Sequence, residues 1–226
     1  MLPNLARRSA LLLGMAGLSA CAAPARGPAV PRGQTGRATV LGIPNERFFP
    51  ALGTGPITQE FYAALARRQR FMGVAPGQML PTLDLLAVSG GGDDGAFGAG
   101  LLNGWSAAGT RPEFMLVTGV STGGLIAPFA FLGSEYDAGL RRVYTQSTLA
   151  DILIQRSLLN GVLNDGMADT TPLFRTISRE LDATMIGRIA EGYRQGRLLL
   201  IGTTDLDAQL PVIWNLGAIA ASGHPG

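Results

Sequence analysis

The sequence predicts an α/β fold with a largely parallel central sheet, and three observations carry this prediction. Short apolar runs alternate with helical patterns along the 226 residues, which is typical of βαβ units. The run 198–201 is apolar enough to be buried on both faces, as strands of parallel sheets usually are. Glycine-rich turns follow the apolar runs that end near residues 89 and 118. A chain of this length suits one domain with extensions.

The N-terminal half is predicted to hold a first helix and two strand–helix units. These elements are, in order, a helix over 58–72, a strand over 84–89, a helix over 96–105, a strand over 114–118 and a helix over 124–132. Thr58 is the expected N-cap of the first helix, and Phe61 and Leu65 form its apolar stripe. Pro128 is expected to break or kink the last helix, because proline lacks the N–H that the helix needs.

The C-terminal half continues the alternation. Its predicted elements are helices over 136–145, 173–181 and 183–194, followed by strands over 197–203 and 211–215. Asp169-Thr170-Thr171-Pro172 is a capping sequence followed by proline in the first turn, which starts the helix at residue 173. Gly196 ends the helix over 183–194.

The N-terminus has the pattern of a targeting segment. Arg7 and Arg8 precede a run of apolar and small residues over 9–20, which is shorter than the ~20 residues that span a bilayer. Leu18-Ser19-Ala20-Cys21 resembles a bacterial lipobox, in which Cys21 would be lipidated. The alternatives are an ordinary signal peptide with an incidental cysteine and, on a weaker match, a twin-arginine signal. We therefore expect an exported, membrane-anchored lipoprotein, in the periplasm or at the cell surface.

The sequence divides into three parts on this interpretation. Residues 1–20 are the signal peptide, 21–80 a proline-containing tether and N-terminal extension, and 81–226 the folded domain. Cys21 is the only cysteine, so no intrachain disulfide is expected. Nothing in the charge pattern indicates a nucleic-acid partner, because Arg7 and Arg8 account for the formal net charge of +2. The basic cluster over 67–70 is a solvated helix end or, alternatively, a contact with anionic lipid.

The sequence Gly119-Val120-Ser121-Thr122-Gly123 matches the G-x-S-x-G nucleophile elbow. A tight strand-to-helix turn exposes the Ser121 hydroxyl, and the small residues Gly119 and Gly123 make room for the turn. Upstream, Gly90-Gly91-Gly92-Asp93-Asp94-Gly95 joins a strand to a helix. Successive glycine N–H groups can point into one concavity, which suits a developing oxyanion.

These two motifs, in this order and spacing, resemble those of the patatin-like phospholipases. The resemblance covers about residue 83 to the end of the chain. It implies a three-layer α/β sandwich, a lipid or ester substrate and no cofactor or metal. It also implies a Ser-Asp dyad, with Ser121 as nucleophile and main-chain N–H groups of Gly90, Gly91, Gly92 and Thr122 around the oxyanion. A dyad without histidine agrees with the presence of a single histidine, His224, near the end of the chain.

The sequence departs from the family pattern in two places. Asp94 stands where the family loop carries a basic residue. No Asp-Gly-Gly or Asp-Gly-Ala follows Ser121, so we expect the sheet to be incomplete at the C-terminus and the dyad aspartate to be missing from this sequence. Such a truncation should leave an unpaired strand edge and exposed apolar surface near 198–201 and 211–216. Three other aspartates, Asp165, Asp205 and Asp207, are interpreted as turn residues.

Three alternatives remain open at this point. The glycine loop also satisfies G-x-G-x-x-G, the dinucleotide-binding pattern, although Asp93 and Asp94 would place negative charge at the pyrophosphate. His224 could serve as the base of a triad, but it lies in a Gly/Pro-rich tail. A non-catalytic, lipid-anchored scaffold or an inactive gene product would also explain the missing aspartate. No feature of the sequence sets head-group preference, acyl-chain preference or oligomeric state.

Overall fold

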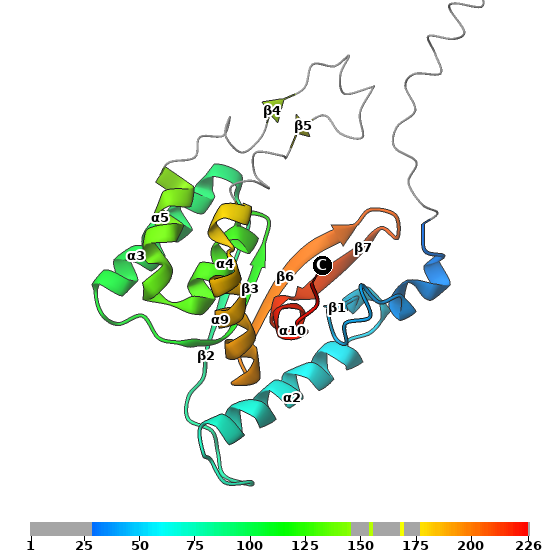
Figure 1. Cartoon of the computed structure of the whole chain (residues 1–226), viewed down its shortest axis with the longest axis horizontal. Coiled ribbons are helices and arrows are strands. Elements are labelled where there is room, and N and C mark those ends of the chain that lie inside the picture. Colours follow the sequence, from blue (N-terminus) through cyan, green and yellow to red (C-terminus); the bar gives the residue numbers. More distant parts are fainter. Residues whose placement is uncertain (1–28, 146–153, 156–167, 170–176, 226) are drawn as a thin grey trace, which may run out of the picture.

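A five-stranded sheet with the order β1-β7-β6-β3-β2 forms the centre of the protein (Figure 1). The computed structural model describes residues 29–145, 154–155, 168–169 and 177–225. The three strands β2 (Asp84–Val88), β3 (Phe114–Val120) and β6 (Leu198–Asp205) are parallel to one another. β7 (Leu210–Asn215) returns antiparallel to β6, and β1 (Arg47–Phe48) pairs antiparallel with β7. The predicted α/β class and parallel core are confirmed, with an antiparallel extension on one side.

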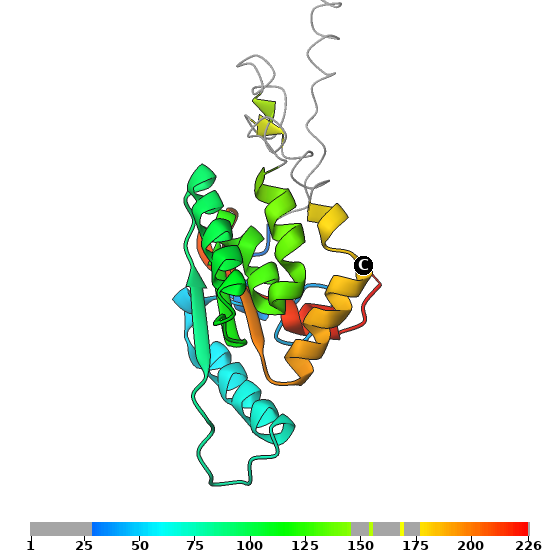
Figure 2. The same cartoon turned by 90° about the vertical axis from the view of Figure 1, so that its left-hand side faces the viewer.

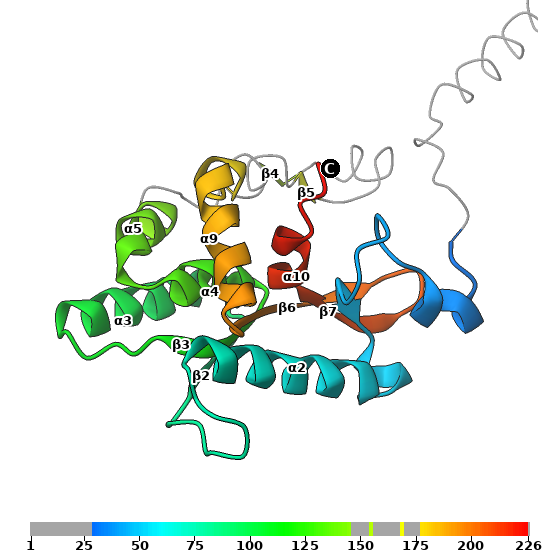
Figure 3. The same ribbon diagram turned by 60° about the horizontal axis from the view of Figure 1, so that its bottom comes forward.

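Helices cover both faces of this sheet, so the domain has three layers. Helix α2 (Gly55–Phe71) runs along one face, and the other helices lie on the opposite face (Figure 3). The helices of that second layer are α3 (Gly95–Ala107), α4 (Thr122–Leu132), α5 (Asp137–Thr145), α9 (Ala183–Arg194) and α10 (Leu216–Ala221). Two short strands, β4 (Ile154–Gln155) and β5 (Ala168–Asp169), form a separate antiparallel pair. The structure also describes four 3-10 turns, η1 (Arg32–Arg37), η2 (Pro50–Leu52), η3 (Gly92–Asp94) and η4 (Ser134–Tyr136), and a helical segment over 177–180. Residues 173–176, the first part of the helix predicted over 173–181, lie outside the described residues.

Two apolar clusters fix the layers to the sheet. The larger cluster lies between the sheet and helices α3, α4, α5 and α9, and Phe131, Leu140 and Met185 are completely buried in it. The smaller cluster joins Ala64 of α2 to Met115, Leu198 and Leu200 on the other face of the sheet. Because most of α4 is buried, its first turn has a fixed position relative to β3.

The predicted N-cap of the first helix is wrong, and the break expected at Pro128 does not occur. Helix α2 begins at Gly55 with Pro56 in its first turn, so the N-cap position belongs to Thr54 and not to Thr58. Helix α4 continues through Pro128 to Leu132. The Arg111 guanidinium donates hydrogen bonds to the carbonyls of Phe129 and Ala130, 3.1 and 3.0 Å away, and so supports the helix beyond the proline.

The predicted location of exposed apolar surface is also wrong. β6 lies in the middle of the sheet, paired with β3 on one side and β7 on the other, and Leu198 and Leu200 are buried. Within the described residues, β1 and β2 are the outer strands. Apolar side chains are instead exposed on β2 and at the end of β3, where Leu85 is 56% and Val120 54% exposed.

Two arginines of the basic cluster at the end of α2 contact other parts of the protein, whereas Arg70 is exposed. Arg67 donates to Glu60 at 2.7 Å, and its guanidinium stacks over the Tyr193 ring. Arg68 pairs with Glu113 at 2.6 Å, and Glu113 also lies 3.6 Å from the buried Arg197. These contacts tie α2 to the sheet and to the second layer. They favour neither of the two interpretations of this cluster, a solvated helix end or an anionic-lipid contact.

Candidate active site

Ser121 lies in the turn that joins β3 to α4, with its backbone in an unusual conformation. Its φ is 54° and its ψ is −128°, a combination that L-residues adopt only under constraint from their surroundings. The strand ends at Val120, the helix begins at Thr122, and the Gly124 N–H donates to the Ser121 carbonyl at 2.8 Å. Ser121 is exposed to solvent. This is the geometry of a nucleophile elbow.

Contact with neighbouring backbone explains the two glycines of the elbow motif. A Cβ at Gly119 would lie 2.3 Å from the Gly123 carbonyl oxygen, and one at Gly123 would lie 2.3 Å from the Val88 carbonyl oxygen. Both neighbours are main-chain atoms, so neither can move aside cheaply. The two glycines therefore let β2, β3 and the start of α4 approach one another.

The glycine-rich loop after β2 lies directly against Ser121. β2 and β3 are adjacent and parallel, with Val88 opposite Gly119, so the two loops leave the sheet at the same edge. A Cβ at Gly90 would lie 2.9 Å from the Ser121 Cβ and 3.5 Å from its Oγ. The structure therefore brings together two motifs whose contacting residues, Gly90 and Ser121, are 31 positions apart in the sequence.

Gly91 and Gly92 differ in whether the backbone conformation at that position favours glycine. Gly92 has a φ of 57°, which favours glycine, and a Cβ there would meet open space. Gly91 has a φ of 165°, which any residue adopts, and its Cβ would contact the Asp94 side chain at 3.2 Å. Asp93 and Asp94 are both exposed in η3, so the loop beside Ser121 is acidic in the structure as in the sequence.

The other candidate acids and bases lie in different surroundings. Asp205 accepts main-chain hydrogen bonds from Asp207 and Ala208 at 3.1 and 3.0 Å, so its carboxylate stabilises the β6–β7 turn as predicted. It stands three residues beyond Gly202, the residue opposite Val120 at the end of β3. His224 follows α10, and its main-chain N–H donates to the Ser222 hydroxyl. Asp165 and Cys21, with the whole predicted signal peptide, lie outside the described residues.

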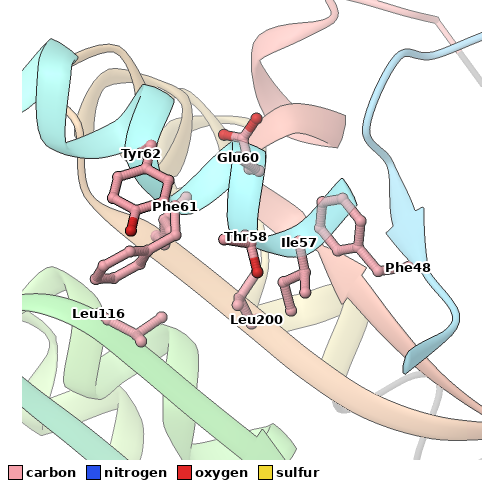
Figure 4. A pocket seen from close by; sticks show the side chains of 9 residues that line it. Phe48, Ile57, Thr58, Glu60, Phe61, Tyr62, Leu116 and Leu200 are labelled. Carbon is pink, nitrogen blue, oxygen red and sulfur yellow. The ribbon is translucent and has the colours of Figure 1, made fainter. Parts of the chain in front are cut away.

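A cavity of about 250 Å³ occurs elsewhere, between α2 and the sheet (Figure 4). Its walls are mainly apolar and include Phe48, Phe61, Leu116 and Leu200. Leu116 pairs with the first residue of β6, so the cavity reaches the opposite end of the parallel strands from Ser121. It is therefore separate from the candidate active site.

Two further residues contact the elbow: Tyr144, which sequence reasoning missed, and Gly95, which it placed only in the glycine loop. Tyr144, in the last turn of α5, donates its hydroxyl to the Thr122 carbonyl at 3.0 Å. Gly95, at the start of α3, faces both Thr122 and Tyr144. Gly95 is the last glycine of the G-x-G-x-x-G pattern, so the sequence did contain a signal for it. No pattern in the sequence connects Tyr144 with Thr122, 22 residues earlier.

No membrane-spanning helix and no metal centre is found within the part of the chain that the structure describes. None of the helices there is both long and apolar enough to cross a bilayer. The described His, Cys, Asp and Glu residues likewise do not gather in threes at any point where they could hold a metal ion.

A strained serine between a parallel strand and a buried helix, with a glycine loop against it, defines a nucleophile-elbow protein of the α/β class. The model of the patatin-like phospholipase family matches residues 86–212, more than half of the chain, and the chain belongs to this family. The match includes both motifs, which argues against the dinucleotide-binding alternative. Comparisons with curated proteins and with solved structures find no match. Membership supports a hydrolase of the phospholipase/esterase type that acts on lipid.

Proposed function

We propose that this protein is a serine lipid acyl hydrolase, in which Ser121 is the nucleophile. The observation that carries the proposal is the contact between the two motifs: Gly90 lies so close to Ser121 that a Cβ there would come within 2.9 Å of the serine Cβ. A reactive hydroxyl and a loop rich in main-chain donors thus share one surface, as acyl transfer requires.

In the proposed reaction, Ser121 Oγ attacks the carbonyl carbon of an ester while its proton passes to the general base. The main-chain N–H groups of Thr122 and of the loop Gly90-Gly91-Gly92 stabilise the negative charge on the carbonyl oxygen. Collapse of this intermediate leaves an acyl group on Ser121, and the base returns the proton to the departing alcohol. Water then hydrolyses the acyl-enzyme by the same steps. The scheme uses no metal or organic cofactor.

The proposed base is the aspartate of a Ser-Asp dyad, supplied by residues outside this sequence. Two observations support this: no Asp-Gly-Gly or Asp-Gly-Ala follows Ser121, and Asp205 is engaged in a turn. An open reading frame that encodes such a tripeptide downstream of the Gly226 codon would support the dyad. A stop codon in that position would contradict it.

Hydrolysis of a p-nitrophenyl ester by the full chain, meaning the protein that includes the proposed dyad aspartate beyond Gly226, tests the proposed activity. We expect the wild type to release p-nitrophenol and the Ser121→Ala variant to release it about 10⁴-fold or more slowly. No activity in either protein would favour the non-catalytic scaffold, whereas equal activity in both would show that Ser121 is not the nucleophile.

We propose further that the mature protein is an exported lipoprotein, held on a membrane through Cys21. The pattern Leu18-Ser19-Ala20-Cys21 after Arg7-Arg8 and a short apolar run supports this. Each buried CH₂ of an attached acyl chain adds about 0.8 kcal/mol to membrane binding, so several chains together anchor stably. The anchor would keep the proposed active site near a lipid substrate.

Replacement of Cys21 by Ser is expected to abolish palmitate labelling and to release the protein from the membrane fraction. Both effects follow because the thiol is the group that would be acylated. Labelling and fractionation in a bacterial host provide the measurement. Labelling of the Cys21→Ser variant at the wild-type level would show that the cysteine is incidental.

A further inference from the structure

Three helices meet directly behind the elbow. Figures 1 and 2 show α3, α4 and α5 side by side, and residues of all three helices are in contact there. A Cβ at Gly95 of α3 would lie 3.0 Å from both the Thr122 Cβ and the Tyr144 Cε1. It would also lie 3.1 Å from the Thr122 Oγ1. Thr122, the residue that follows the nucleophile, therefore lies close to Gly95 of α3 and to Tyr144 of α5, and an added methyl group at Gly95 would press on both.

The first turn of α4 is not held by its own N-cap. Ser121 occupies the N-cap position, and its side chain makes no capping hydrogen bond. Its strained backbone persists only if the surrounding structure fixes the residues on both sides. On the strand side, the β3 pairings with β2 and β6 provide this restraint. On the helix side, the Tyr144 hydroxyl donates to the Thr122 carbonyl at 3.0 Å.

The chemistry of Tyr144 suits a permanent hydrogen-bond donor. Burial raises the pKa of its phenol from the usual 10 to about 12, so the hydroxyl keeps its proton at neutral pH. The Thr122 Oγ1 beside it is buried and has no hydrogen-bond partner among the described residues. The Tyr144 phenol thus gives the main chain of Thr122 a hydrogen bond that comes from outside α4.

We infer that Tyr144 is a positioning residue of this site, whose hydroxyl holds the first turn of α4 so that the Thr122 N–H is aimed at the oxyanion. The inference rests on the proposed function, in which Ser121 is the nucleophile. Thr122 carries both the carbonyl that Tyr144 binds and the proposed oxyanion donor. Fixing the carbonyl therefore limits rotation of the residue and of the N–H on its other side. Tyr144 itself touches no reacting atom.

The Tyr144→Phe variant of the full chain tests this inference in steady-state ester hydrolysis. We expect kcat to fall about tenfold with KM unchanged, the size expected if one neutral hydrogen bond is lost mainly in the transition state. The control is Tyr136→Phe, since Tyr136 packs against the same core from the neighbouring η4. A purely structural role for Tyr144 would lower the melting temperature but leave kcat at wild-type level below that temperature.

A second variant disturbs the contact between Tyr144 and Thr122 from α3. Gly95→Ala should press on Thr122 and Tyr144 and lower kcat in the same way, while Tyr144 keeps its hydroxyl.

Labelling of Ser121 by a fluorophosphonate distinguishes failure of the proposed function from failure of the inference about Tyr144. If wild type is not labelled, the proposed function fails and the inference fails with it. If wild type is labelled and Tyr144→Phe turns over ester at the wild-type kcat, the inference alone is overturned.

Discussion

Replacing Ser121 by Ala in the full chain is expected to lower kcat for ester hydrolysis by about 10⁴-fold or more. The variant loses the oxygen that forms the acyl-enzyme, so any remaining rate comes from oxyanion stabilisation and binding alone. The melting temperature should not change, because the Ser121 side chain is exposed and makes no capping hydrogen bond. The measurement is the initial rate of p-nitrophenol release at saturating ester.

Ser134→Ala is the matched control for this variant, since Ser134 is also an exposed serine at the start of a helical turn. It should retain the wild-type kcat. If Ser121→Ala keeps most of the activity while Ser134→Ala loses it, the elbow is not the catalytic centre, and Ser134 would be the next residue to investigate.

The Gly123→Ala variant is expected to destabilise the fold strongly. The new Cβ would lie 2.3 Å from the Val88 carbonyl oxygen and 2.6 Å from that of Ser89. Because both neighbours are backbone atoms, the start of α4 has to move away from β2. Overpacking of this kind costs about 1–3 kcal/mol, and we expect the upper end of that range together with loss of turnover. Chemical denaturation and ester hydrolysis measure the two effects.

Gly100→Ala is the control, because a Cβ at Gly100 in α3 would meet open space. Alanine should stabilise that helix by about 0.5–1 kcal/mol, through its better helix propensity. Equal stability of Gly123→Ala and wild type would contradict the close approach of β2 and α4. A destabilised Gly100→Ala variant would mean that glycine is needed there for a reason other than space.

Local patterns were sufficient to predict most of the fold. The helix predicted over 183–194 is α9, because Asp182 caps it through the Met185 N–H and Gly196 lies just beyond its end. The strand predicted over 211–215 is β7, one residue longer. The pairing of β7 with β6 could not be predicted in the same way. The apolar run of β6 indicates a strand buried on both faces but does not say which strand pairs with each of its sides, so β6 was wrongly expected to lie at an exposed edge.

In the candidate site too, local motifs could be predicted from the sequence, whereas contacts that depend on packing could not. Gly119, Ser121 and Gly123 form a contiguous motif whose spacing predicts the turn, and the structure has that turn. The contact of Gly90 with Ser121 follows from the parallel pairing of β2 and β3, which sequence order alone suggested. Tyr144 reaches Thr122 because of how α5 packs on α3 and α4, and no residue pattern encodes that packing.

Mapping a fluorophosphonate adduct on the full chain tests most directly whether Ser121 is an activated nucleophile. The account predicts one adduct per chain, on the peptide that contains Ser121, and none on the Ser121→Ala variant. Pretreatment with a slowly hydrolysed ester should delay labelling, because an acyl group would occupy the same oxygen. An adduct on a different residue, or a wild-type protein that hydrolyses ester without ever being labelled at Ser121, would contradict the account.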